Sequence, residues 1–166
     1  MEEKKRVRLY PVNKDDKSGA PLHIHIVNHT HRNILIKEVL IKVQDDNSNL
    51  ELYGEIFEML LSFWNICGDE KQKFFVTFDF SKHVPLNVLL IQESAKFFMN
   101  VKKITQKMCF CTLILCDSPI VTSILNMVRM FYVPSRPMHV ECCETCAVDY
   151  VTSNYDVTEE LSLGTF

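Results

Sequence analysis

Four histidines occur close together near the start of the chain, at spacings that could place them around a metal ion. His23 and His25 alternate within the segment LHIHIVNH, so on a strand both imidazoles would project from one face. His29 and His31 belong to a polar turn predicted over 28–33. Zinc requires neutral imidazoles that converge on a tetrahedral point, usually beside a thiolate or carboxylate, and this spacing matches no established zinc pattern. The sequence therefore favours a solvent-facing strand with titratable side chains, and a metal site is the alternative.

A second cluster of metal ligands or redox groups lies near the other end of the chain. It consists of His139, Cys142, Cys143 and Cys146, and the last two cysteines form a CxxC motif. In a thioredoxin-type enzyme the CxxC opens a helix after an early strand, where the helix dipole lowers the thiol pKa. Here the motif follows the last predicted strand, so its position counts against redox chemistry. We expect buried, unreactive thiols, with a structural metal site completed by a neighbouring chain as the alternative.

Serine, histidine and aspartate gather at a third place, where two predicted parallel strands end. Asp79, Ser81 and His83 follow one of these strands, and Asp117 and Ser118 follow the next. The carboxyl edge of a parallel sheet is where open α/β folds bind ligands. A hydrolase would also need an exposed serine on a strained turn and an oxyanion hole, but the chain has no GxSxG motif and only 4 glycines. We therefore expect helix capping and contact with an anion or a partner here, and no enzyme.

These side chains depend on strands and helices that the hydrophobic pattern predicts. Alternating or continuous apolar segments, typical of strands, occupy 22–27, 34–43, 74–80, 109–116 and 138–142. Apolar residues at helical spacing predict helices at about 50–68, 85–107, 119–132 and 144–155. The second strand changes phase at Lys37 and Glu38, where we expect a bulge or bend. Strands separated by helices of ten or more residues indicate parallel crossover units.

The predicted fold is a single α/β domain with one mixed, mainly parallel sheet and helices on its faces, in the order β-β-α-β-α-β-α-β-α. The charged residues 1–20 predict a mobile N-terminal arm, although Val7, Leu9 and Tyr10 could form a short edge strand. The domain itself is predicted over 21–155 and a polar tail over 156–166.

Composition narrows the classes of protein to which this chain could belong. With 166 residues, 47% of them hydrophobic, it can bury one sizeable core. A net charge of −3 counts against a nucleic-acid or anionic-membrane partner. No apolar run approaches the roughly 20 residues of a membrane span, and the start MEEKKRVRLY lacks a signal-peptide core. Seven cysteines, an odd number, fit reduced thiols. We expect a soluble intracellular protein, in the cytoplasm, an organelle or a virion interior, without a cofactor.

The order of these elements over 22–150 resembles the STAS domain of anti-sigma-factor antagonists and sulfate-transporter tails. The segment FFVTFDFSKHVPLNVLLIQESAKFFMNV (74–101) carries the resemblance, because it is similar to that family's strand ending in Asp-Leu-Ser and the helix that follows. In phosphorylatable members the helix begins with an Asp-Ser-Ser-Gly-like sequence whose serine is the kinase target. Here the matching residues KHVPLNV (82–88) contain no serine and no glycine. The resemblance therefore implies partner binding at this edge without the serine switch.

We accordingly expect a non-enzymatic, STAS-like regulatory or assembly module that binds another protein or its own copy. Its predicted contact residues are Ser81, His83, Leu86, Asn87, Asp117 and Ser118. Residues 74–140 also resemble the strand-helix-strand finish of the CRAL-TRIO lipid-binding fold, which implies a carrier of a small hydrophobic or anionic ligand as an alternative. A structural subunit of a larger viral or organellar assembly is a further alternative.

Overall fold

A single six-stranded sheet forms the frame of the protein. The computed structural model describes residues 5–10, 22–44, 50–82, 88–116, 119–120, 123, 125–126, 130, 133–141 and 146–156. The strands are β1 (Lys5–Tyr10), β2 (Leu22–His31), β3 (Ile34–Val43), β4 (Phe74–Asp79), β5 (Cys109–Leu115) and β6 (Met138–Glu141). Each strand lies beside the one that precedes it in the chain, so the order in the sheet is the order in the sequence.

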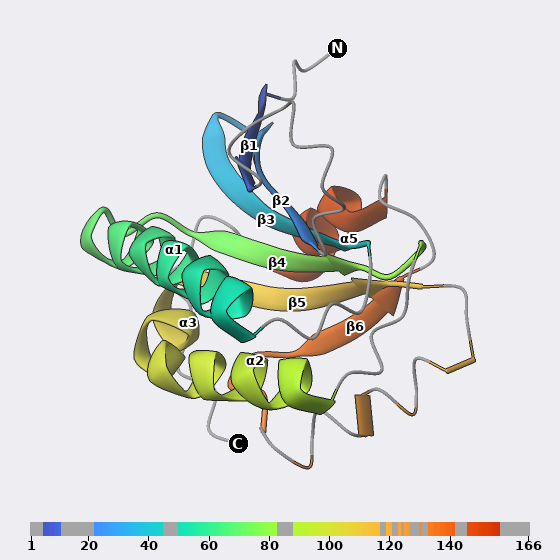
Figure 1. Cartoon of the computed structure of the whole chain (residues 1–166). Coiled ribbons are helices and arrows are strands. Elements are labelled where there is room, and N and C mark those ends of the chain that lie inside the picture. Colours follow the sequence, from blue (N-terminus) through green and yellow to red (C-terminus); the bar gives the residue numbers. More distant parts are fainter. Residues whose placement is uncertain are drawn as a thin grey trace.

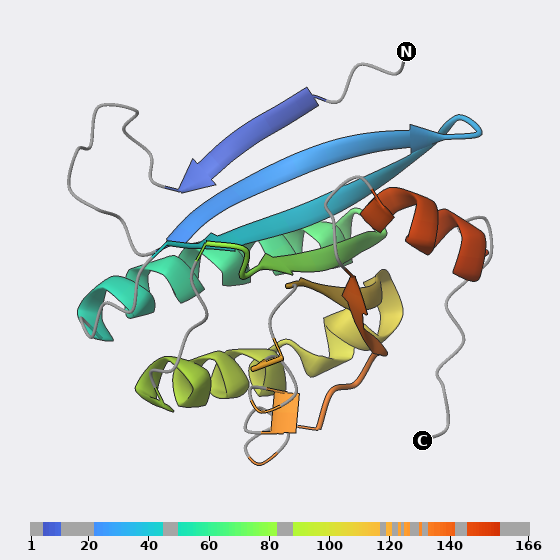
Figure 2. The same cartoon turned by 90° about the vertical axis from the view of Figure 1, so that its right-hand side faces the viewer.

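The sheet is mixed, as predicted for the α/β class. β1, β2 and β3 pair antiparallel, whereas β3, β4, β5 and β6 pair parallel. Helices α1 (Leu50–Asp69), α2 (Val88–Asn100) and α3 (Lys102–Met108) lie together on one face of the parallel part (Figure 1). Helix α5 (Cys146–Asn154) lies on the opposite face, as the turned view makes plain (Figure 2). Both faces of the central strands are therefore covered.

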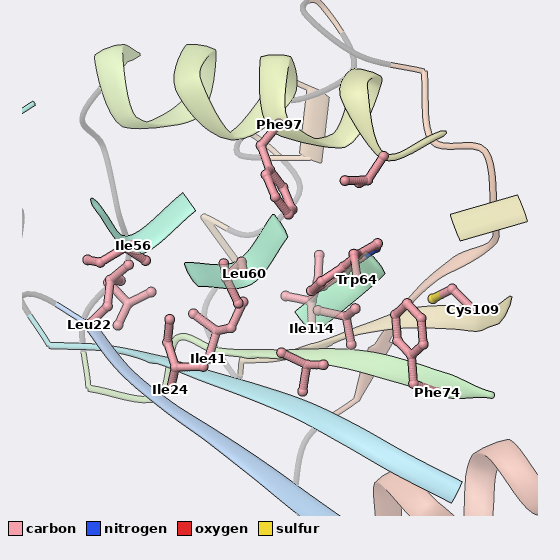
Figure 3. Close-up of a cluster of buried hydrophobic side chains, with 14 of the residues drawn as sticks. Leu22, Ile24, Ile41, Ile56, Leu60, Trp64, Phe74, Phe97, Cys109 and Ile114 are labelled. Carbon is pink, nitrogen blue, oxygen red and sulfur yellow. The ribbon is translucent and has the colours of Figure 1, made fainter. Parts of the chain in front are cut away.

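The main hydrophobic core fills the space between α1, α2, α3 and the sheet (Figure 3). Trp64 of α1 lies in it without exposed surface, and its ring centroid is 5.0 Å from that of Phe74 and 5.3 Å from that of Phe97. Both contacts are edge-to-face, the geometry that aromatic pairs prefer. The indole Nε1–H donates to Thr105 Oγ1 at 3.1 Å, which satisfies the only polar atom of this side chain.

A second, smaller core lies under α5, and it explains the change of phase in the second predicted strand. Ile36 packs there, on the same face as Phe75 and Leu113. Val39 and Ile41 belong to the main core on the other face. β3 pairs with β2 and with β4 without any shift of register, so of the bulge or bend predicted at Lys37 and Glu38 the bulge is wrong. The apolar residues change parity because the first part of the strand packs against the smaller core on one face and the later part packs against the main core on the other face.

The antiparallel part of the sheet is longer than the sequence indicated. Residues 5–10 form the edge strand β1, the alternative to a wholly mobile arm, and their backbone pairs with β2. β2 continues to His31, so the turn predicted over 28–33 is wrong in extent. The turn consists of Arg32 and Asn33, whose positive φ values of 49° and 65° suit a two-residue hairpin.

The helices follow the predicted pattern with one change. The single helix expected over 85–107 is two helices, because the chain breaks at Val101 before α3 begins at Lys102. Lys102 and Lys103 therefore open α3, and only Lys107 lies in a last turn, where a cation favours the helix dipole. Most of the helix predicted over 119–132 and the tail 157–166 lie outside the described residues. None of the described helices is long and apolar enough to cross a membrane.

Candidate functional site

At the carboxyl edge of the sheet, the structure brings together Asp79 and Ser81, two of the predicted chemical residues. Asp79 is buried at the end of β4, where its Oδ1 accepts the Ser81 backbone N–H at 2.9 Å and its Oδ2 lies 3.4 Å from Lys42 Nζ. Burial opposes ionisation, but the hydrogen bonds from Ser81 and the charge of Lys42 outweigh it and hold the pKa of Asp79 below its ordinary value. The carboxylate thus fixes the turn after β4, while Ser81 itself is exposed.

The rest of the predicted contact surface cannot be placed beside these two residues. The remaining residues of that prediction lie outside the described part of the chain: His83, Leu86, Asn87, Asp117 and Ser118. Partner binding at this edge therefore stays a prediction.

The histidines of β2 are not a solvent-facing row. His25 and His29 are buried, which contradicts that interpretation, whereas His23 is partly exposed. His29 Nε2 lies 2.8 Å from Glu38 Oε2 on β3, and its ring stacks on Phe75 at 5.9 Å. The sequence interpretation failed because it assumed that only one face of the hairpin is covered.

His139 contacts two tyrosine side chains. Its Nε2 lies 3.2 Å from the hydroxyl of Tyr155, and its ring packs against Tyr150 with centroids 4.7 Å apart. No group of three or more histidine, cysteine or acidic side chains within the described residues could hold a metal ion. The side chains of the other predicted ligands in this cluster lie outside that description: Cys142, Cys143 and Cys146.

Four cysteines are described as buried free thiols: Cys67, Cys109, Cys111 and Cys116. Burial raises the pKa of Cys67 to about 11 and that of Cys111 to about 12, and it raises the pKa of Cys109 as well. Since the thiolate is the nucleophile and the metal ligand, the raised pKa disfavours reaction of Cys67, Cys109 and Cys111 at neutral pH.

A cavity lies between the helices and the main face of the sheet. Its volume is about 120 Å³. Helices α1 and α2 form one wall, and strands β2 to β6 form the other. Figure 3 shows Phe97 reaching down from α2 toward Leu60 and Trp64 of α1, with Ile41 and Ile114 rising from the sheet below. The cavity is thus built from side chains that the helical and strand patterns already assigned to the core.

Aromatic rings from α1, α2 and the end of β4 contribute to the lining of this cavity. Six of them contribute: Phe57, Trp64, Phe78, Phe80, Phe97 and Phe98. Almost all of the lining surface is apolar. An apolar cavity of about 150 Å³ can remain dry and bind benzene, so a cavity of this size and composition suits a group about as large as one ring.

Comparison with known proteins leaves the chain without an assigned family. No protein-family model, no curated protein and no solved structure matches it. The resemblances to STAS and CRAL-TRIO domains therefore remain predictions.

A few polar groups interrupt the apolar lining: Ser94, Thr105, Thr112, Ser135 and Arg136. Thr105 Oγ1 accepts the Trp64 indole N–H and donates to the Val101 carbonyl at 3.0 Å, so its hydrogen bonds serve the fold. Among the described lining residues there is no histidine, aspartate or glutamate, and the Cys109 thiol has a raised pKa. The described lining therefore contains no histidine or carboxylate that could act as a general base.

Sequence reasoning assigned the aromatic residues to helical stripes and buried strands, and it missed the space between them. One signal was available: stripes rich in large rings face one another from 50–68, 74–80 and 85–107. Rigid rings that meet from three elements leave gaps more readily than flexible aliphatic chains do. Arg136 carried no such signal, because it lies in the loop segment VPSRP (133–137).

Proposed function

We propose that this protein is a non-enzymatic carrier or sensor that binds a small apolar molecule in the cavity between α1, α2 and the sheet. The observation that supports the proposal is the cavity itself, a space of about 120 Å³ with an aromatic, almost wholly apolar lining. Ligand sites in proteins are concave and mainly apolar, with a few polar groups that set orientation. The described lining fits that description.

The size of the cavity sets the strength of binding that we expect. Empty apolar space costs about 24 cal/mol per Å³, so a molecule that fills 120 Å³ recovers about 3 kcal/mol. Since a dissociation constant of 1 mM corresponds to about 4.1 kcal/mol, benzene should bind with a dissociation constant of a few millimolar. A natural ligand would add polar contacts and bind more tightly.

Trp64 gives a direct test, because it is the only tryptophan of the chain and lines the cavity. Its single indole N–H signal in a proton–nitrogen NMR spectrum should shift as benzene is added. Ala95→Leu places a larger side chain in the cavity lining and should abolish that shift. Lys96→Leu is the matched control, because it adds leucine at the next, exposed position of α2. An unshifted indole signal at saturating benzene, or an equal shift in Ala95→Leu, would refute the proposal.

A second candidate function is protein binding at the carboxyl edge, as the STAS resemblance implies. It is favoured by Val88 and Leu89 at the start of α2, large apolar side chains that are 45% and 47% exposed. Ser81 and Lys82, which are also exposed, precede the same helix. Exposed apolar groups beside polar ones are typical of contact surfaces.

The second candidate can be tested with a matched pair of variants. Replacing Val88 and Leu89 by serine should weaken self-association, measured by sedimentation equilibrium, or co-purification of a partner from the native source. Met99→Ser removes an apolar side chain of similar exposure, 50%, at the far end of α2 and should have no effect. If the two variants behave alike, the start of α2 is not a protein-binding surface.

A further inference from the structure

The hydroxyl groups of the cavity lining differ in how they are engaged. Thr105 bonds to the Trp64 indole and to the Val101 carbonyl, so its hydroxyl is fully used by the fold. Ser94 and Ser135 also take part in interactions within the chain. The remaining hydroxyl of the described lining belongs to a threonine of β5, and it is the one that a ligand can use.

Arg136 also lines the cavity, but its contacts lie with the smaller core. Its Nε–H donates to the carbonyl of Phe110 at 3.3 Å. Burial raises the pKa of Cys111 to about 12, and the nearby charge of Arg136 opposes that rise. Phe110 and Cys111 both belong to the smaller core under α5. The guanidinium is therefore engaged away from the cavity, and a buried ion would cost a ligand far more than a neutral group does.

Thr112 lies on the cavity face of β5. Its strand neighbours Val76 of β4 and Met138 of β6 both line the cavity, and Ile114 rises from the same face two residues further along (Figure 3). The Thr112 backbone N–H donates to the Pro137 carbonyl at 2.9 Å, whereas no described residue hydrogen-bonds to its hydroxyl. A group that can both donate and accept thus faces an almost wholly apolar space.

Aromatic rings lie close to this hydroxyl. Phe78 of β4 is the register partner of Ile114, and its ring centroid is 6.2 Å from that of Phe98 on α2. Both phenylalanines are only partly buried, and both line the cavity. Residues two apart on a strand are separated by about 6.6 Å, so a ligand ring beside Phe78 can direct a substituent toward Thr112.

We propose that the ligand is a neutral molecule of one aromatic ring with a single hydroxyl or carbonyl group, which hydrogen-bonds to the Thr112 hydroxyl. The inference rests on the proposed function, since it concerns the same cavity. The volume of about 120 Å³ suits one ring. A second polar group on the ligand would be buried without a partner, which lowers affinity, so the lining selects for one such group.

The test compares phenol, which is neutral at pH 7, with toluene, which has a methyl group in place of the hydroxyl. Binding of each is measured by titration of the Trp64 indole N–H signal. Thr112→Val removes the hydroxyl and keeps the branched shape of the side chain. It should weaken binding of phenol about fivefold, the loss expected for one hydrogen bond, and leave binding of toluene unchanged.

The neighbouring strand supplies a matched control. Thr77 is buried on β4, and its register partner Leu113 belongs to the smaller core, so it lies on the face opposite the cavity. Thr77→Val makes the same replacement there and should leave both affinities unchanged. Thr112→Ser keeps a hydroxyl at the cavity and should bind phenol more tightly than Thr112→Val does, which separates loss of the hydrogen bond from a change of cavity shape.

The outcomes distinguish this inference from the function on which it rests. If Thr112→Val weakens phenol and toluene equally, or weakens neither, the assigned contact is wrong and the apolar carrier stands. If benzene, toluene and phenol all leave the indole signal of the natural protein unshifted, the proposed function fails as well.

Discussion

The buried hydrogen bond between His29 and Glu38 should contribute more to stability than the exposed ion pair between Lys96 and Glu93. The two side chains are 4% and 3% exposed, and 2.8 Å separates Nε2 of His29 from Oε2 of Glu38. Glu38→Ala would leave the imidazole buried beside Phe75 without that partner. Leaving a buried polar group without its hydrogen-bond partner costs about 1–3 kcal/mol, and we expect a loss of that size in the free energy of unfolding.

Urea unfolding at neutral pH measures this loss, and the chain supplies a matched control. Glu93 and Lys96 form an ion pair on the surface of α2, with side chains 39% and 64% exposed. Glu93→Ala removes the same type of group from water, where an ion pair contributes less than about 1 kcal/mol. A much larger loss in the free energy of unfolding for Glu38→Ala than for Glu93→Ala would show that burial of the contact, and not the removal of a carboxylate alone, causes the loss.

A double replacement tests the reason for the loss. Changing both His29 and Glu38 to leucine removes both members of the hydrogen bond and leaves no buried polar group unsatisfied, so it should cost much less than Glu38→Ala alone. If Glu38→Ala cost less than about 1 kcal/mol, or if the double variant were the less stable of the two, the pair would not have the buried role that its geometry indicates.

Three further predictions concern other buried polar groups. The folded pKa of Asp79 lies below its ordinary value of 3.8, so its stabilisation is present above that pH and is lost as the pH falls through the lower folded value. Asp79→Asn should therefore lower the free energy of unfolding, measured with urea, by about 1 kcal/mol at pH 7 and by less at pH 3. An equal loss at both pH values would contradict a lowered pKa of Asp79 in the folded protein. Thr105→Val removes the acceptor of the Trp64 indole and should cost about 1–3 kcal/mol by the same assay, whereas an unchanged midpoint would mean that the indole finds another partner. With four of 7 cysteines described as buried, no more than three thiols should react with a disulfide reagent at pH 8 before urea is added; a fourth fast thiol would show that this part of the fold opens.

Local sequence pattern predicted most of the elements, because it records which residues face a core. The β-branched run of β3 and the helical stripe of α1 were found where their periodicity placed them. The bulge at Lys37 and Glu38 was wrong because periodicity does not tell how many faces of a strand are covered. Glu38 is buried, and its partner there is His29, nine residues away across the hairpin.

The candidate site was less predictable, because a cavity is a property of several elements at once. The sequence assigned Trp64, Phe97 and Phe80 to apolar stripes or strands, but the space between them depends on how far α1 and α2 stand from the sheet. Arg136 reaches the cavity because its loop is bound to the start of β5 through Phe110. Nothing in the neighbouring residues of Arg136 indicates that contact.

The agreement between strand order and chain order has a consequence for biosynthesis. As the chain leaves the ribosome, β2 finds β1 already made, β3 finds β2, and each later strand meets a neighbour that is already available. No strand must wait for a segment still to be synthesised, and none has to insert between two that have already joined. The sheet can therefore grow from its amino-terminal edge at the pace of translation, about 5–20 residues per second, and expose one growing edge at a time.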